Sequence, residues 1–149
     1  MTVATGGHPP IYHLSAPTGQ AIRPQASRPK GGMLIGALAE PRFAATTFRL
    51  APGEALLLYT DGLTEARTET GDMLGEQGLT AFLTERSGPA GATAIVEDTV
   101  ALIDTLPRDA GDDVALLALS VPAADTDVDG AAVTAHTIAP AGPTPEKHP

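Results

Sequence analysis

Acidic residues stand next to the two most apolar segments of this sequence. Asp61 follows the apolar run 54–60, and Asp112 and Asp113 precede the apolar run 114–121. If these runs are adjacent antiparallel strands, the end of one meets the start of the other, and the carboxylates converge at one edge of a sheet. Carboxylate ligands suit Mg²⁺ or Mn²⁺ better than zinc or copper. A metal pair held in this way activates a water and binds phosphoryl oxygens, so the spacing predicts phosphate hydrolysis.

A purely structural explanation of the same acids stays open. An Asp-Gly pair such as Asp61 and Gly62 is common in the turn that follows a strand. Two aspartates before a strand, as at Asp112 and Asp113, are common in a solvated loop. Spacing alone therefore leaves a metal site and an ordinary pair of loops as alternatives.

Composition narrows the classes of function. The chain has 149 residues, with 9 Lys plus Arg against 18 Asp plus Glu, and this gives a formal net charge of −9 at pH 7. Such a balance provides no basic surface for nucleic acid or for an anionic membrane. There is no cysteine, which excludes disulfides, thiolate zinc sites and cysteine nucleophiles. No apolar run is long enough to span a membrane and no secretory signal is visible, so we expect a cytoplasmic protein without nucleic-acid or membrane partners.

The elements that must position these acids form one α+β domain over residues 1–121. The expected elements are short strands at 2–5 and 11–14, a hairpin of 42–50 and 54–60 around a turn at 51–53, two amphipathic helices near 79–83 and 96–106, and a buried strand at 114–121. The segment 17–32 is rich in Pro, Gly, Ser and Arg, which predicts a long surface loop. The segment 122–149 shows neither helical nor strand periodicity, which predicts a disordered tail.

Several segments resemble a known family in their order and spacing. The most specific is Tyr-Thr-Asp-Gly-Leu-Thr-Glu-Ala-Arg at 59–67, which lies between Gly-Gly-His-Pro-Pro at 6–10 and Gly-Asp-Asp-Val-Ala-Leu-Leu at 111–117. Gly-Gly-Met-Leu-Ile-Gly at 31–36 and Gly-Asp-Met-Leu-Gly-Glu at 71–76 add to the pattern. Together, over about residues 3–121, they resemble the SpoIIE/RsbU group of metal-dependent type 2C (PPM) protein serine/threonine phosphatases.

The resemblance implies an α-β-β-α sandwich with mainly antiparallel sheets and a two-metal centre of Mn²⁺ or Mg²⁺. Asp61 matches the metal-binding aspartate of the family's Tyr-Thr-Asp-Gly motif, and Asp112 matches its late metal-binding aspartate. Asp113 is a weaker candidate ligand, and Gly62 is expected to shape the turn that directs Asp61. His8 is a further weaker candidate, either as a proton donor or as a phosphate contact, and shaping its Gly-Pro turn is the alternative role.

The sequence departs from the family pattern before Asp61. Similar proteins supply further metal ligands from Gly-Asp-x-x-Asp and Asp-x-x-Gly-His-Gly segments, and neither segment occurs here. The only acids before Asp61 are Glu40 and Glu54. The chain therefore resembles the C-terminal portion of a phosphatase domain, with an incomplete metal centre. We also expect exposed sheet edges that a second copy or another partner would cover.

Two functions of different classes follow from these observations. The first is a protein phosphatase that hydrolyses phosphoserine or phosphothreonine on a regulatory protein, such as an anti-sigma-factor antagonist. The second is a non-catalytic interaction or regulatory module that keeps the fold without the metal centre. A truncated gene product with no settled role is a third alternative.

Overall fold

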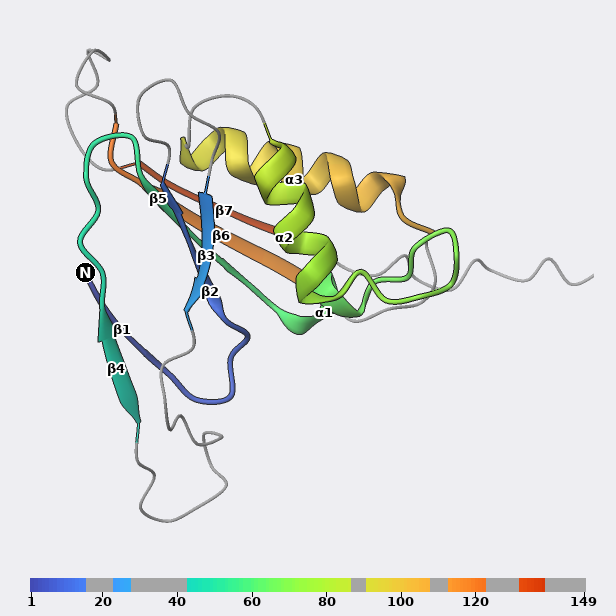
Figure 1. The fold of residues 1–149 in the computed structure, drawn as a ribbon, viewed down its shortest axis with the longest axis horizontal. Coiled ribbons are helices and arrows are strands. Elements are labelled where there is room, and N and C mark those ends of the chain that lie inside the picture. The colour runs from blue at the N-terminus through green and yellow to red at the C-terminus, as the bar shows by residue number, and fades with distance from the viewer. Residues whose placement is uncertain (16–22, 28–42, 87–90, 108–112, 123–131, 139–149) are drawn as a thin grey trace, which may run out of the picture.

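The computed structural model describes residues 1–15, 23–27, 43–86, 91–107, 113–122 and 132–138. Its elements (Figure 1) are, in chain order, β1 (Thr2–Thr5), β2 (Ile11–Ser15), β3 (Arg23–Ser27), β4 (Ala44–Thr47), β5 (Ala55–Tyr59), α1 (Asp61–Glu65), α2 (Gly75–Glu85), α3 (Ala92–Thr105), β6 (Val114–Ser120) and β7 (Ala132–Ile138). Among these helices, none combines the length and the hydropathy needed to cross a bilayer.

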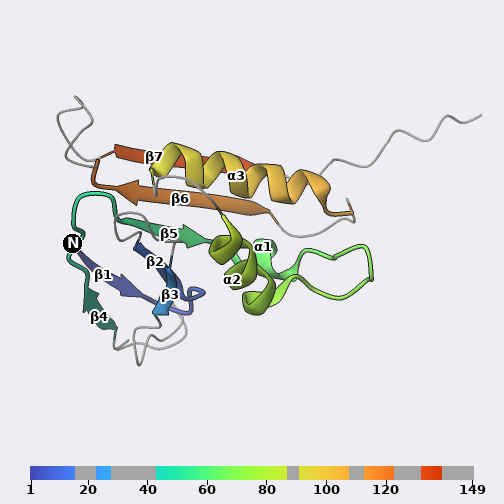
Figure 2. The ribbon, with the colours of Figure 1, turned by 45° about the horizontal axis from the view of Figure 1, so that its top comes forward.

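The strands form two antiparallel sheets. Five strands make one sheet in the order β3-β2-β5-β6-β7, and β1 pairs with β4 in a separate two-stranded ribbon. Helices α2 and α3 lie on one face of the large sheet, and α3 runs along β6 and β7 (Figure 2). The chain is therefore α+β with antiparallel sheets, as expected, and this arrangement is compatible with an α-β-β-α sandwich.

Alternating side chains along β5 divide the core into two clusters, because neighbouring residues of a strand point to opposite faces. Ala55, Leu57 and Tyr59 are buried on the face that carries the helices. Leu56 is buried on the opposite face with Ile11 and Phe48, which lies just after β4. The strand is apolar on both faces because both are covered, as its sequence predicted.

The two helices contribute apolar stripes to the first cluster. Leu79 and Leu83 of α2 are fully buried at a spacing of four residues, which places them on one helical face. Ile95 and Thr99 of α3 are buried with the same spacing, and Thr99 Oγ1 donates to Ile95 O at 2.7 Å. The helices predicted from this periodicity are thus confirmed.

The expected hairpin of 42–50 and 54–60 is wrong. The strand in its first arm, β4, pairs with β1 in the register Ala4↔Ala45 and belongs to the other sheet. Both edges of β5 are already occupied, by β2 and by β6. The turn at 51–53 is present, since Glu54 N donates to Ala51 O at 3.0 Å, but it connects two sheets rather than two paired strands.

Two segments predicted to lack regular structure contain strands. Within the expected loop 17–32, β3 pairs with β2, and within the expected tail 122–149, β7 pairs with β6 along its whole length. The sequence analysis did not predict β7 because its alanines and threonines resemble a polar tract. Four of its seven residues are β-branched, which favours a strand. The remainder of both segments lies outside the described residues, apart from Pro122, and the domain boundary at 121 stays a prediction.

Candidate functional site

The candidate site lies at the edge of the large sheet where β5 ends and β6 begins. These two strands are adjacent and antiparallel, with Tyr59 opposite Leu116, which is the arrangement that the sequence argument required. Asp61 comes two residues after Tyr59, and Asp113 directly precedes β6. The pairing therefore brings the segments that carry Asp61 and Asp113 to the same edge.

The side chain of Thr60 fastens the two strand ends together. Its Oγ1 donates to Asp113 O at 2.9 Å and accepts from Ala115 N at 2.9 Å. The backbone N of Thr60 also donates to Ala115 O at 3.1 Å. Three hydrogen bonds thus hold the residue before Asp61 against the residues on either side of Val114. Sequence reasoning missed this role, although a threonine between an apolar strand and an aspartate is a usable signal for a side chain that bonds to backbone.

Asp61 begins the short helix α1 and is exposed to solvent. Its Oδ1 accepts a hydrogen bond from the backbone N of Gly62 at 3.2 Å. Thr64 Oγ1 donates to the backbone O of Asp61 at 3.0 Å. The second oxygen of the carboxylate, Oδ2, makes no hydrogen bond with a described residue, and the residue is exposed, so a ligand can reach it.

Gly62 is expected to shape the turn that directs Asp61, and this role stays a prediction. It is buried inside α1, and the described glycines with positive φ are Gly7, Gly53, Gly71 and Gly75. The chain changes direction after β5 by entering a helix rather than by a left-handed turn. Gly62 still acts on Asp61 through its backbone, because its N–H donates to the Asp61 carboxylate.

Of the two acids that precede β6, the structure describes Asp113. Asp113 is exposed, and its backbone oxygen, not its side chain, is engaged by Thr60. Asp112 lies outside the described residues. The metal-binding roles of Asp61, Asp112 and Asp113 therefore remain predictions, although the strand pairing on which they depend is present.

His8 belongs to a segment that reaches the same edge. Strand β2 runs antiparallel to β5 with Tyr12 opposite Leu57, so the residues before β2 extend toward the end of β5. His8 is exposed, and its Nδ1 lies 2.8 Å from Pro9 O. The roles considered for His8 stay predictions, and the contact with Pro9 shows it engaged with its own loop.

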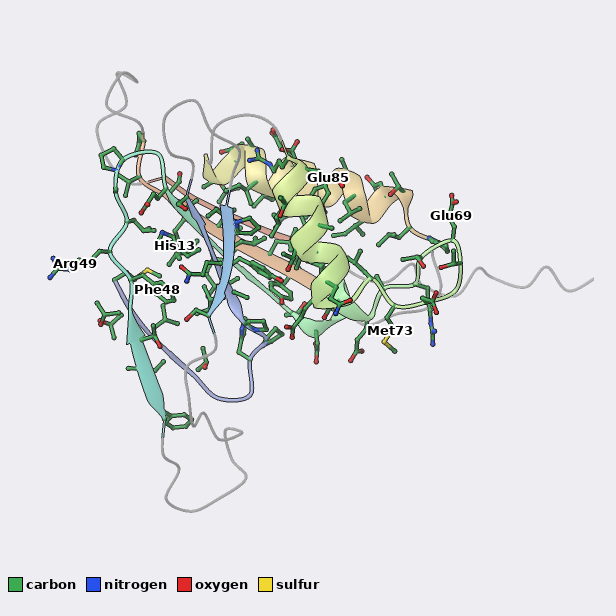
Figure 3. The ribbon with its side chains drawn as sticks, viewed as in Figure 1. His13, Phe48, Arg49, Glu69, Met73 and Glu85 are labelled. Atoms are coloured by element: carbon green, nitrogen blue, oxygen red, sulfur yellow. The ribbon has the colours of Figure 1, made fainter. Side chains whose placement is uncertain are left out.

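Glu54 lies at the other end of β5 from Asp61, about 20 Å away along the strand. Its Oε2 lies 3.1 Å from His13 Nε2 and accepts from Ala51 N at 2.9 Å. The His13 ring also contacts Phe48 edge-on, and Figure 3 shows both residues far from the loop between α1 and α2. Glu54 therefore stabilises a turn and is not a ligand at the candidate site.

The donor set at the edge fits part of a metal centre. Carboxylate oxygens are the type of ligand that Mg²⁺ and Mn²⁺ prefer, and Mg²⁺ is often bound by one or two carboxylates with several waters. In the part of the chain that the structure describes, no group of three His, Asp or Glu side chains converges as metal ligands would. The residues present thus suit one hydrated ion, and a pair of ions needs more carboxylates.

A shallow groove elsewhere on the surface is separate from these acids. It lies between β3 and α2, and its lining residues are Tyr12, Ala26, Glu76, Gln77, Thr80 and Ala81. Two of these residues contact each other, since the Tyr12 hydroxyl oxygen lies 2.7 Å from Thr80 Oγ1. Neither Asp61 nor Asp113 contributes to the lining, so the groove offers no cavity for a substrate of the candidate site.

Comparison with known proteins assigns the chain to a family. The family model described as Stage II sporulation protein E (SpoIIE) matches residues 1–122. Protein IcfG of Synechocystis sp. is 32% identical over 84 residues, which are 56% of this chain and 12% of that protein. The chain thus spans a small part of the length of this relative, and no solved structure matches it significantly. Because the family match covers most of the sequence, from β1 through β6, the chain belongs to the SpoIIE family of type 2C protein phosphatases.

Proposed function

We propose that the chain forms part of a metal-dependent protein serine/threonine phosphatase in which Asp61 and Asp112 are ligands of Mn²⁺ or Mg²⁺. The substrate is a phosphoserine or phosphothreonine on a small cytoplasmic regulatory protein, such as an anti-sigma-factor antagonist. Membership of the SpoIIE family supports the reaction class. The substrate class rests on the family resemblance of the motifs at 59–67 and 111–117.

The observation that carries this proposal is the antiparallel pairing of β5 with β6. It supports the proposal because it brings the segments that carry Asp61 and Asp113 to one edge of the sheet, although about 50 residues separate them in the sequence. Thr60 fixes this relationship through its hydrogen bonds to Asp113 O and Ala115 N.

When bound, the metal supplies an activated water and charge compensation for the phosphoryl oxygens. The residues of this chain would hold the metal and orient the groups that react. The Asp61 carboxylate is held by the N–H of Gly62 on one oxygen, which leaves the other for the cation. His8, whose segment extends toward the same edge, is the candidate proton donor to the leaving alkoxide of the serine or threonine.

The number of carboxylates sets a condition on activity. A two-metal centre requires more ligands than Asp61 and the 112–113 pair supply, and Glu54 is held in the turn at the opposite end of β5. Further carboxylates must therefore come from another segment or another polypeptide. The same shortage supports the second candidate function, a regulatory module that keeps the fold and binds a partner without catalysis.

Manganese titration tests the proposed ligands directly. We expect the chain to bind Mn²⁺ in the micromolar range by calorimetry. Asp61→Asn and Asp112→Asn should each weaken binding at least tenfold, because each removes a charged oxygen ligand. Glu85→Gln is the matched control, since Glu85 is an exposed acid on α2 remote from the edge (Figure 3). Equal binding by all four proteins, or no binding by the unaltered chain, would contradict the ligand assignment.

Hydrolysis separates the two candidate functions. If the chain is catalytic, it releases phosphate from a phosphoserine peptide in the presence of Mn²⁺, and Asp61→Asn abolishes the release. If it is a regulatory module, no phosphate is released and a captured phosphoprotein partner is retained equally by the unaltered chain and by Asp61→Asn. Loss of partner capture in Asp61→Asn would count against the module.

A further inference from the structure

The large sheet has two edge strands, β3 and β7. Strand β7 pairs with β6 along seven residues, from Ser120↔Ala132 to Val114↔Ile138. Its other side pairs with no described strand, and Figure 2 shows β7 at the margin of the sheet beside α3. It also lies after residue 122, where the SpoIIE match ends. An edge strand of this length presents a row of N–H and C=O groups to any strand that can reach it.

The hydrogen bonds of β6 show which way its backbone groups point. Thr60 N donates to Ala115 O at one end of the strand, and Val121 N donates to Glu54 O at the other. Backbone groups alternate between the two neighbours of an inner strand, so the odd-numbered residues of β6 face β5 and the even-numbered ones face β7.

The register carries this alternation across to β7. Its residues opposite the even-numbered residues of β6 are Ala132, Thr134, His136 and Ile138. These residues direct their N–H and C=O groups at β6. The outward row consists of Val133, Ala135 and Thr137, whose backbone groups point away from the sheet.

The opposite edge of the sheet is protected. Strand β2 faces β5 through Tyr12, which is opposite Leu57, so His13 faces β3. Its partner there is Gln25, and the outward positions of β3 are therefore Pro24 and Ala26. Proline has no N–H, and placing it with that side outward removes a donor from an exposed edge.

Strand β7 has no such protection. Residues 132–138 contain no proline, no glycine and no Asp, Glu, Lys or Arg. The side chain of Thr134 faces α3, since its Oγ1 lies 3.1 Å from Thr93 Oγ1. Proline and charged side chains are the usual means by which an edge strand avoids pairing, so this edge is open by composition, and none of the described strands covers it.

We propose that β7 pairs antiparallel with β7 of a second copy of this chain, so that the two large sheets become continuous. Full overlap of residues 132–138 places the two-fold axis at Ala135, with Val133 opposite Thr137. Outward residues then face outward residues, which lets each free N–H meet a free C=O. A second copy fits this edge because the outward row can pair with itself and residues 132–138 contain no Asp, Glu, Lys or Arg. Two chains of net charge −9 therefore meet here without like charges facing each other.

Disulfide trapping tests the register. The chain has no cysteine, so each variant carries a single thiol. Across the proposed axis the two Ala135 Cα atoms are about 5.5 Å apart, within the range that a disulfide spans. Ala135→Cys should therefore form a covalent dimer on mild oxidation.

Two single-cysteine controls accompany this variant. Thr137→Cys lies on the same outward row, but it is opposite Val133 and about 13 Å or more from its own copy, so it should remain uncrosslinked. Ala101→Cys, at an exposed position of α3, should remain monomeric as well. Equal cross-linking of all three variants, or none in Ala135→Cys, would overturn the proposal.

Oligomeric state provides an independent measurement. Size-exclusion chromatography with light scattering should show a concentration-dependent dimer of the full chain. Ala135→Pro should shift the dissociation constant upward at least tenfold, because it removes the outward N–H at the axis and leaves the bonds to β6 in place. Ala135→Thr keeps that N–H and should retain the dimer. Circular dichroism confirms that both variants are folded, and a monomer at all concentrations in the unaltered chain would refute the interface.

Discussion

Thr60 donates its hydroxyl to the backbone oxygen of Asp113 across 2.9 Å, and so joins two segments that lie 53 residues apart in the sequence. The hydroxyl oxygen of Thr60 also accepts a hydrogen bond from Ala115 N. The hydroxyl thus takes the place of a backbone group in the last rung between β5 and β6. Asp61 follows it directly, so Thr60 holds the segment that carries Asp61 against the segment that carries Asp113.

Replacing Thr60 by valine should destabilise the fold and weaken metal binding together. The change leaves Ala115 N without its acceptor and Asp113 O without its donor, at a cost of about 1 to 2 kcal/mol in the free energy of unfolding. Urea denaturation measures the stability and Mn²⁺ titration the affinity. Thr60→Ser keeps the hydroxyl and is the matched control. Unchanged stability in Thr60→Val would show that the hydroxyl does not hold the strand ends.

Glu54→Gln should lower stability without altering Mn²⁺ affinity. Glu54 accepts from Ala51 N and contacts His13, so loss of its charge weakens both interactions by about 0.5 to 1.5 kcal/mol together. The strand β5 separates it from Asp61, so the candidate ligands are unaffected. The two measurements are chemical unfolding and calorimetric titration with Mn²⁺. A clear loss of metal affinity would place Glu54 at the metal and contradict its assignment to the turn.

Gly53→Ala should cost about 1 to 2 kcal/mol, because Gly53 has a φ of +83° that L residues adopt only with strain. A Cβ atom at this position meets nothing within 4 Å, so the cost comes from the backbone alone. Gly53→Asn should cost less, since asparagine tolerates the left-handed region better. Thermal unfolding compares the three proteins, and an alanine variant as stable as the unaltered chain would show that the turn adapts.

Tyr12→Phe should destabilise the packing of α2 on the sheet by about 0.5 to 1.5 kcal/mol. The Tyr12 hydroxyl donates to Glu76 O at 3.1 Å and lies 2.7 Å from Thr80 Oγ1. Thr80 keeps its own bond to Glu76 O at 2.7 Å in the variant, which limits the loss. Leu79→Ala, which opens a cavity in the same interface, should cost more, about 2 to 5 kcal/mol. Urea unfolding ranks the two, and the reverse order would contradict this account of how α2 is held.

Local patterns determined the elements that lie closest to the candidate site. The apolar run before Asp61 and the apolar run after Asp113 predicted β5 and β6, and spacing of apolar residues predicted α2 and α3. These predictions succeeded because each element buries a regular face, and a regular face leaves a period in the sequence. The motif at 59–67 pointed to the family for a different reason, since it is specific enough to stand without any structure.

Pairing between strands was decided only by the tertiary structure. A turn at 51–53 suggested a hairpin, yet β5 pairs with β2 and β6, and β4 pairs with β1, because strand pairing depends on contacts between segments far apart in the sequence that a local turn signal does not encode. The alanine and threonine tract at 132–138 gave no local signal for β7, which forms because the edge of β6 offers it a partner along seven residues. The sequence alone identified Asp61 and Asp113 as candidate acids. That their segments lie at one edge depends on long-range hydrogen bonds, such as the one from Thr60 Oγ1 to Asp113 O, and no local pattern in the sequence encodes such bonds.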